Sequence, residues 1–206
     1  EHVKNLIAQA GGSISFAAFM QHVLYAPGLG YYVSGTTKFG ADGDFVTAPE
    51  TSPLFGQVLA RQCAQVLEQI DGRQIIELGA GSGKLAATLL GRLATLDVLV
   101  DRYFILEVSP DLRQRQEDLL RDQIPALCDR VEWLSCLPGN FSGVIVANEV
   151  ADALPVERFV KTGDSLKQCR VIVENGAFQW RYDEAPAALA GAVNDIEAKH
   201  GLCLAD

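Results

Sequence analysis

Residues 75–84, with the sequence Ile-Ile-Glu-Leu-Gly-Ala-Gly-Ser-Gly-Lys, constrain the fold more than any other part of the chain. A short apolar run contains the acid Glu77, a turn with glycine at every second position follows, and leucines at helical spacing come next. This order predicts a buried strand, a tight turn and the N-terminus of a helix. Glycines in such a turn permit sharp backbone bends and leave no Cβ in the way of an approaching ligand.

Two well-known glycine motifs do not fit this turn. A phosphate-binding P-loop requires Gly-x-x-x-x-Gly-Lys-Ser/Thr, and its first glycine and its hydroxyl would fall on Leu78 and Leu85. A dinucleotide fingerprint requires Gly-x-Gly-x-x-Gly, and its third glycine would fall on Lys84. The pattern is instead Glu-x-Gly-x-Gly-x-Gly, whose leading carboxylate suits a ligand with a cationic group or hydroxyls. The alternative is a glycine-rich turn that binds nothing.

A second acid follows a second predicted strand. The run Tyr103-Phe104-Ile105-Leu106 is apolar, Glu107 comes next, and Ser109-Pro110 is a typical helix start. In doubly wound sheets, an acid at the tip of the second strand accepts hydrogen bonds from ribose hydroxyls, about 20 residues after the glycine turn. Glu107 lies slightly further than that from Gly83, so it is a candidate ribose-binding residue. The alternative is an exposed acid at the end of a strand.

Composition narrows the class of protein. A chain of 206 residues with 49% hydrophobic residues can bury a core of one domain or slightly more. The net charge of −9 disfavours nucleic acid as a partner, and no apolar run approaches the ~18 residues of a membrane span. The five cysteines are scattered without metal-ligand spacing, so we expect a reduced intracellular protein and no metal site. No signal peptide or transit pattern is evident at the start of the sequence.

Strand and helix patterns alternate along the middle of the chain, which predicts a parallel sheet. Helices are expected over 1–10, from Ser15 onward, from Ser52 to Gly72 including Ile70, and over 186–200. Further strands are expected over 131–134 and 144–147, followed by an antiparallel meander of 158–160, 169–174 and 177–182 with a hairpin turn at Asn175-Gly176. The stretch 26–52 is too long for an ordinary connection, and its aromatic content favours a functional loop.

Three further segments carry unusual combinations of residues. They are Leu-Tyr-Ala-Pro-Gly-Leu-Gly-Tyr-Tyr (24–32), Phe-Gly-Ala-Asp-Gly-Asp-Phe-Val-Thr-Ala-Pro-Glu (39–50) with Ser-Pro-Leu-Phe-Gly (52–56), and Ala-Asn-Glu-Val-Ala-Asp-Ala-Leu-Pro-Val (147–156). These segments resemble the MidA-like methyltransferases, whose mitochondrial members serve as complex I assembly factors. The glycine turn itself resembles the first motif of class I S-adenosylmethionine-dependent methyltransferases. The resemblance runs from about Phe16 to Phe159. One departure is Ala151, where family members often carry a bulkier residue.

The resemblance implies an α/β fold: a class I methyltransferase (Rossmann-like) parallel sheet with an N-terminal helical and loop lid and a small antiparallel meander. The regions expected are the helical and lid region 1–72, the S-adenosylmethionine-binding core 73–157, and the meander and helix 158–206. Such a sheet has seven strands, and only four appear in the alternating series. We therefore expect the chain to lack C-terminal strands, and a chain incomplete in this way is expected to be inactive by itself.

The resemblance also assigns residues to the donor, S-adenosyl-L-methionine. The donor's amino-acid end is assigned to Glu77, Gly79, Ala80, Gly81 and Gly83; its ribose to Glu107 and Ser109; and its adenine to Trp133 and Leu134. The segment 31–52 is expected to fold over the donor as a lid, because so long a loop with aromatic side chains is rarely without a function. Its residues Thr47, Pro49 and Glu50 are expected to face inward.

The acceptor implied by the resemblance is a protein arginine, with a respiratory complex I subunit as the candidate partner. Carboxylates can hold a guanidinium bidentately and orient it toward the methyl group. The candidate catalytic residues are Glu149, the best placed after the fourth strand, then Asn148, Asp152 and Glu50. Alternatives remain open: Asp44 suits a turn, Glu50 suits the positive end of a helix, and Asp152 suits a local cap.

Three classes of function follow. The first is an S-adenosylmethionine-dependent protein-arginine methyltransferase, in the bacterial cytoplasm or the mitochondrial matrix according to its source. The second is an assembly factor with this fold that binds a partner without catalysis. The third is a nucleotide-dependent oxidoreductase, which the failed dinucleotide fingerprint disfavours.

Overall fold

The computed structural model describes residues 1–33, 47–163 and 165–202, and the chain forms two compact units. The meander unit comprises Glu1–Tyr31 and Leu154–Asp206, and the parallel-sheet unit comprises Tyr32–Ala153. The first 31 residues therefore group with the C-terminal part of the chain. The division into 1–72, 73–157 and 158–206 is a different partition and stays a prediction.

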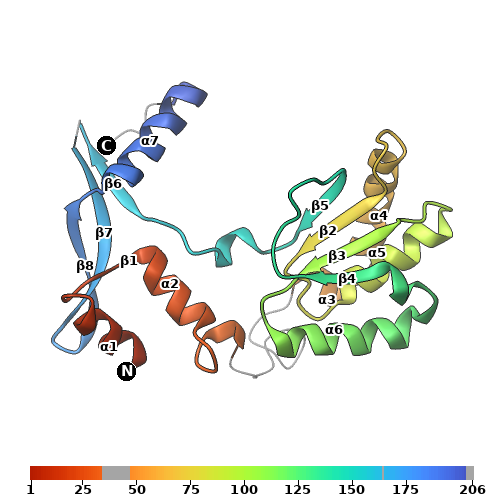
Figure 1. Ribbon diagram of the computed structural model, residues 1–206, viewed down its shortest axis with the longest axis horizontal. Coiled ribbons are helices and arrows are strands. Elements are labelled where there is room, and N and C mark those ends of the chain that lie inside the picture. Colours follow the sequence, from red (N-terminus) through yellow and green to blue (C-terminus); the bar gives the residue numbers. More distant parts are fainter. Residues whose placement is uncertain (34–46, 164, 203–206) are drawn as a thin grey trace. The chain divides into compact units, whose positions relative to one another are not determined.

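The parallel-sheet unit is built on four strands in the order β4-β3-β2-β5 (Figure 1). The strands are β2 (Gln74–Leu78), β3 (Arg102–Leu106), β4 (Val131–Leu134) and β5 (Gly143–Ala147). All three pairings are parallel, as the alternation of strands and helices predicted. The order places the glycine-turn strand β2 between β3 and β5, so the turn has a strand end on either side.

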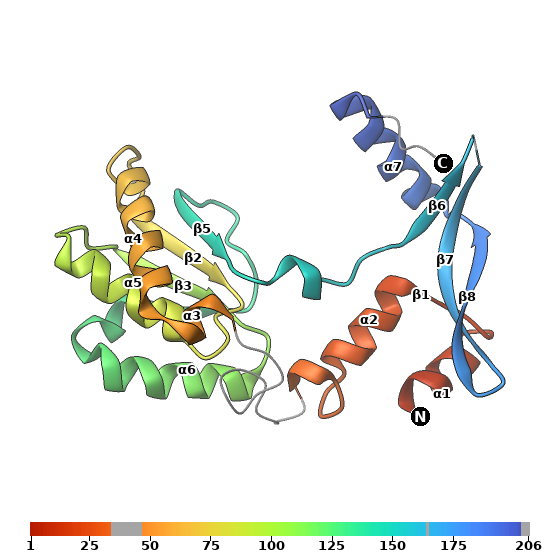
Figure 2. The same cartoon turned by 180° about the vertical axis from the view of Figure 1, so that it is seen from behind.

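Helices cover one face of this sheet. They are α4 (Pro53–Leu67), α5 (Lys84–Thr95) and α6 (Pro110–Gln123), preceded by the short α3 (Ala48–Thr51). Helices α4 and α5 lie behind the sheet in Figure 1 and in front of it in Figure 2. Their apolar stripes bury the strand residues Ile75, Tyr103 and Ile105, which are all fully enclosed. Burial of such side chains, at about 1.5–3 kcal/mol each, holds this unit together.

Two of these helices begin at the predicted caps, and one ends earlier than predicted. The Ser52 Oγ accepts a hydrogen bond from the Leu54 N–H at 3.1 Å, and the Ser109 Oγ accepts one from the Leu112 N–H at 3.4 Å. The prediction that α4 extends to Ile70 is wrong, because the helix ends at Leu67. The Gln69 N–H bonds to the Val66 carbonyl, which tightens the chain into a turn there.

The meander unit is a second, antiparallel sheet with three helices. Its elements are α1 (His2–Gln9), β1 (Ile14–Ser15), α2 (Phe16–Tyr25), β6 (Phe159–Thr162), β7 (Ser165–Glu174), β8 (Ala177–Glu184) and α7 (Ala187–His200). Strand β7 pairs with β1 and β6 on one side and with β8 on the other. The hairpin turn at Asn175-Gly176 is confirmed, with φ angles of 51° and 79°.

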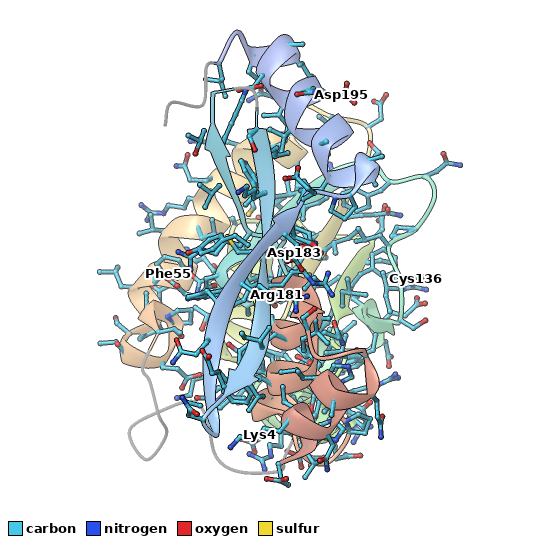
Figure 3. All side chains as sticks on the ribbon, turned by 90° about the vertical axis from the view of Figure 1, so that its left-hand side faces the viewer. Lys4, Phe55, Cys136, Arg181, Asp183 and Asp195 are labelled. Atoms are coloured by element: carbon cyan, nitrogen blue, oxygen red, sulfur yellow. The ribbon has the colours of Figure 1, made fainter. Side chains whose placement is uncertain are left out.

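The strand β1 was missed by the sequence patterns because it has only two residues and runs directly into α2. Ser15 caps that helix as predicted, and its Oγ accepts a hydrogen bond from the Ala18 N–H at 3.1 Å. An arginine pair fixes the residue before β1 to the meander. The Ser13 Oγ accepts from Arg170 Nε at 3.0 Å and from Arg181 Nη2 at 2.6 Å, and Arg181 pairs with Asp183 (Figure 3). Through these bonds the N-terminal segment is joined to β7 and β8, which lie near the other end of the sequence.

The long connection expected over 26–52 contains two short helices at its ends. A 3-10 helix spans Tyr31–Val33 and α3 spans Ala48–Thr51, and the sequence patterns predicted neither of them. Most of the predicted lid, including Asp44, lies outside the described residues. Within the described ranges, no helix is long and apolar enough to cross a membrane.

Candidate functional site

The candidate site lies along the carboxyl edge of the parallel sheet. The register pairs Leu78 with Leu106 on one side and with Ala147 on the other. Gly79, Glu107 and Asn148 therefore leave the sheet at the same level. Open α/β sheets bind ligands at this edge.

The glycine turn joins β2 to α5 in a conformation that requires glycine. Gly79, Gly81 and Gly83 have φ angles of 61°, 55° and 88°, in the left-handed region that side chains with a Cβ rarely adopt. The Gly79 N–H donates to the Leu106 carbonyl at 3.0 Å, and the Gly83 N–H donates to the carbonyl of the buried Ala80 at 2.8 Å. The alternation of glycines in the sequence is thus explained by backbone geometry.

Glu77 is an almost completely buried acid directly before this turn, with 2% of its surface exposed. Its Oε2 accepts a hydrogen bond from the Tyr103 hydroxyl at 2.7 Å. Burial raises the pKa of Glu77 from 4.5 to about 7; the bond from Tyr103 opposes this increase, and the charge of Glu107 adds to it. A carboxylate in this position is costly to ionise unless a cation approaches it.

Glu107 lies immediately after β3 and is held at both oxygens. Its Oε1 accepts from the backbone N–H of Ser109 at 2.9 Å, and its Oε2 accepts from the Gln116 side chain at 3.1 Å. Burial raises the pKa of Glu107, and these hydrogen bonds lower it. Ser109 is itself buried, because its hydroxyl caps α6. The Ser109 hydroxyl therefore bonds to the first turn of α6, and its backbone N–H bonds to the Glu107 carboxylate.

Gln116 was missed by the sequence analysis, although it is the residue that connects the site. It lies on α6, is completely buried, and bonds to the Gly81 carbonyl, to Glu107 and to Trp133. Leu112 and Leu120 flank it at helical spacing and are buried too. The sequence pattern that could have indicated Gln116 is its position between two leucines, at four-residue spacing, on the apolar face of the helix.

Trp133 and Leu134 end β4, beside β3, and both are half-buried. Trp133 donates its indole N–H to Gln116 Oε1 at 2.9 Å, and the Arg113 guanidinium lies 5.6 Å from its ring centroid. Val108 is a second missed residue, with 66% of its surface exposed directly after Glu107. An exposed valine beside a held acid provides apolar surface next to the hydroxyl-binding group.

Glu50 reaches the glycine turn from α3. Its carboxylate pairs with Lys84 Nζ at 2.7 Å and accepts a hydrogen bond from the Ser82 hydroxyl, while only 6% of its side chain is exposed. Thr47 and Pro49 begin the same short helix, and both are half-buried. The structure thereby brings the end of the predicted lid region against the turn.

The segment after β5 carries the remaining predicted residues. Asn148 is half-buried, and Glu149 and Asp152 are exposed. Glu149 has a φ of 54°, a conformation that is uncommon for a residue with a long side chain and costs about 1 kcal/mol or more. The next residue, Val150, lies 3.5 Å from where a Cβ on Gly79 would be, so this segment runs beside the glycine turn.

These groups together fit a ligand with an ammonium group, a vicinal diol and a flat apolar ring. The buried acid and open turn suit the ammonium end, the held acid suits the diol, and Trp133 with Val108 suits the ring. Within the described residues, no cluster of three or more His, Cys, Asp or Glu side chains could hold a metal ion. The fold and this edge define a class I methyltransferase-type domain.

Comparisons with known proteins agree with that class. The family described as "Putative S-adenosyl-L-methionine-dependent methyltransferase" matches residues 58–202, and the chain belongs to this family. The expected class I methyltransferase fold and the resemblance to the MidA-like family are therefore confirmed, and S-adenosyl-L-methionine is the cofactor.

A crystal structure of a Burkholderia thailandensis protein, described as a candidate methyl transferase and bound to S-adenosyl-homocysteine, is similar over 95% of this chain and 52% of its own. The sequence identity is 46% and the TM-score is 0.83. The zebrafish (Danio rerio) mitochondrial protein arginine methyltransferase NDUFAF7 is 30% identical over 80% of this chain, and the mouse (Mus musculus) protein of that name is 32% identical over 86%. The chain spans about half the length of these relatives, at 44% and 46%.

Proposed function

We propose that the protein transfers a methyl group from S-adenosylmethionine to an arginine side chain of a partner protein. The observation that carries the proposal is a pair of acids at the ends of the adjacent strands β2 and β3, the buried Glu77 and the half-buried Glu107, beside a glycine turn. The relatives named as protein arginine methyltransferases support arginine as the acceptor.

On the donor side, we assign the amino-acid end to Glu77 and the turn residues Gly79, Ala80, Gly81 and Gly83. A cationic group beside Glu77 favours the ionised acid and so offsets the burial that raises its pKa. The positive φ angles of Gly79, Gly81 and Gly83 favour glycine, so no side chain stands in the way of a ligand at these three positions.

The ribose is assigned to Glu107, with Ser109 acting through its backbone N–H. The adenine is assigned to Trp133 and Leu134, with Val108 added by its exposure beside Glu107. Thr47 and Pro49 are assigned to the rim of the donor site, because Glu50 of α3 bonds to Ser82 and Lys84 at the glycine turn.

On the acceptor side, we assign the guanidinium to Glu149, with Asn148 and Asp152 in support. Arginine stays protonated at neutral pH, so an acceptor site must hold the guanidinium and orient one of its nitrogens. Glu149 is the exposed carboxylate nearest the sheet edge after β5, and its unusual backbone angle is the kind of strain found at functional sites. Glu50 is assigned a supporting role, since Lys84 and Ser82 already engage its carboxylate.

In this mechanism the chain aligns two reactants. S-adenosylmethionine supplies an already activated methyl group when it is bound. Glu77 holds the amino-acid end of the donor and Glu107 holds its ribose. Glu149 accepts hydrogen bonds from the guanidinium so that one guanidinium nitrogen faces the donor. Such alignment replaces a bimolecular encounter by a pre-oriented one.

The partner proposed is a protein, with a respiratory complex I subunit as the first candidate. The relatives with this arginine methyltransferase name are mitochondrial. We therefore assign the protein to the mitochondrial matrix if its source is eukaryotic and to the cytoplasm if it is bacterial.

The test is a mass spectrum of arginine methylation on candidate partner proteins incubated with S-adenosylmethionine and the full-length protein. Methylated arginine should appear with the wild type and be lost with Glu107→Ala. Donor binding by calorimetry without any arginine methylation would support the alternative of an assembly factor that does not catalyse. Absence of donor binding would contradict both.

A further inference from the structure

We propose that Gln116 is a positioning residue that orients the Glu107 carboxylate for the vicinal diol of the donor's ribose. The inference rests on the proposed role of Glu107. The new element is that selectivity for the diol depends on Gln116, a residue of α6 that bonds to the acid.

The side chain of Gln116 uses both of its N–H groups and its oxygen. Its Nε2 donates to the Gly81 carbonyl at 3.0 Å and to Glu107 Oε2 at 3.1 Å, and its Oε1 accepts from Trp133 Nε1 at 2.9 Å. The indole N–H can only donate, so it determines which end of the amide is oxygen. A flipped amide would place oxygen against the Gly81 carbonyl and the Glu107 carboxylate, and both contacts would be repulsive.

Complete burial makes this arrangement rigid. Gln116 has 0% of its surface exposed, whereas glutamine is mostly found at surfaces. A buried amide that lost one partner would leave an unsatisfied polar group, which opposes any alternative rotamer. The close packing of α6 against the turn adds to this, since a Cβ on Gly83 would lie 3.3 Å from the Gln116 Cα.

The hydrogen bonds from Gln116 and from the Ser109 N–H fix the orientation of the Glu107 carboxylate. A carboxylate has about four lone-pair directions. The Ser109 N–H occupies one at Oε1 and Gln116 occupies one at Oε2. The backbone N–H of Val108 is a further partner of this carboxylate, and the lone-pair directions that are left can accept hydrogen bonds from the neighbouring hydroxyls of a diol. Without Gln116, the carboxylate could rotate away from this orientation.

The same side chain links three parts of the proposed donor site. Gly81 belongs to the turn assigned to the amino-acid end, Glu107 to the ribose, and Trp133 to the adenine. A change in the position of the Gln116 amide therefore affects all three, but the diol depends on it most directly.

The experiment compares calorimetric affinities for S-adenosylhomocysteine and for its 2′-deoxy analogue, which lacks one hydroxyl of the diol. The test variant is Gln116→Met, which keeps length and removes all three hydrogen bonds. The control is Gln114→Met on the same helix, where the exposed amide bonds to the side chain of Asp118 at 3.2 Å. Circular dichroism confirms folding of each variant.

The wild type should prefer the diol over the 2′-deoxy ligand by about 10-fold or more, as expected for a hydrogen bond to a charged group. Gln116→Met should reduce this preference by about 10-fold, and Gln114→Met should leave it unchanged. Equal weakening of both ligands in Gln116→Met would show a merely structural role and overturn the proposal. Unchanged affinities would overturn it as well.

Two further variants keep the outcomes separate. If Gln116→Met does not fold, Trp133→Phe removes the bond that fixes the amide and should still lower the diol preference by several-fold; an unchanged preference overturns the proposal.

Glu107→Ala tests the assignment of Glu107 to the ribose, on which the proposal rests. Loss of the preference in Glu107→Ala but not in Gln116→Met refutes only the role of Gln116. Retention of the preference in Glu107→Ala refutes the assignment of the ribose and, with it, this inference.

Discussion

A Glu77→Gln substitution should change how the stability of the parallel-sheet unit depends on pH. The folded-state pKa of Glu77 is raised from 4.5 to about 7, chiefly by burial. The folded protein therefore holds a proton that the unfolded chain has lost between these two pH values. Stability falls as pH rises through this window, because the charge must then be buried.

The magnitude follows from the size of the shift. At about 1.36 kcal/mol per unit, raising the pKa from 4.5 to about 7 corresponds to about 3 kcal/mol. Glutamine keeps an oxygen that can accept the bond from the Tyr103 hydroxyl, and it carries no charge. Any cost of its buried NH₂ group is the same at every pH. Part of the pH-dependent destabilisation of the wild type already applies at pH 5, which lies above the unfolded pKa, so the unfolding free energy of the variant relative to wild type should rise by about 2.5 kcal/mol from pH 5 to pH 8.

Urea unfolding at both pH values measures this difference without added ligand. The fluorescence of Trp133 reports the parallel-sheet unit once Trp180, the other of the two tryptophans, is replaced by phenylalanine in all proteins compared. Glu132→Gln, an exposed acid on β4, is the matched control and should show no such trend. If the stability of Glu77→Gln relative to wild type stays constant or decreases between pH 5 and pH 8, burial does not raise the pKa of Glu77.

Three further substitutions probe the turn, the acceptor side and α3. Gly81→Val should abolish calorimetric binding of S-adenosylhomocysteine, because a β-branched residue resists a φ of 55°; retained affinity in a folded variant would remove the turn from the site. Glu149→Gln should slow methyl transfer by about 10²–10⁴-fold with donor affinity unchanged. Transfer at the wild-type rate would exclude Glu149 from catalysis, and loss of donor affinity would assign it to the donor. Lys84→Met removes the ion pair of Glu50, so the amides of α3 should exchange hydrogen faster, whereas Lys167→Met on β7 should have no effect on them.

The parts of the fold that the sequence predicted are those determined locally. The turn between β2 and α5 could be predicted because its left-handed angles require glycine, and the helix starts at Ser52 and Ser109 follow from capping chemistry. The parallel strands followed from apolar runs that alternate with helical patterns. In each case the residues that make up the sequence pattern are the same residues that form the turn, cap or strand.

The parts that were missed depend on contacts between distant segments. Strand β1 exists because Ile14 pairs with Val171, and two residues carry no strand pattern of their own. Gln116 gains its role from Gly81, Glu107 and Trp133, which come from three different elements. The ion pair of Glu50 with Lys84 likewise joins α3 to α5, and no spacing in the sequence indicates it.

The most direct test of the central claim is a crystal structure of the protein with S-adenosylhomocysteine. We expect both ribose hydroxyls within hydrogen-bonding distance of the Glu107 carboxylate, the amino-acid end of the ligand against the turn at 79–83, and Gln116 still bonded to Glu107. A ligand bound away from the carboxyl ends of β2 and β3, or a ribose that does not contact Glu107, would contradict this claim.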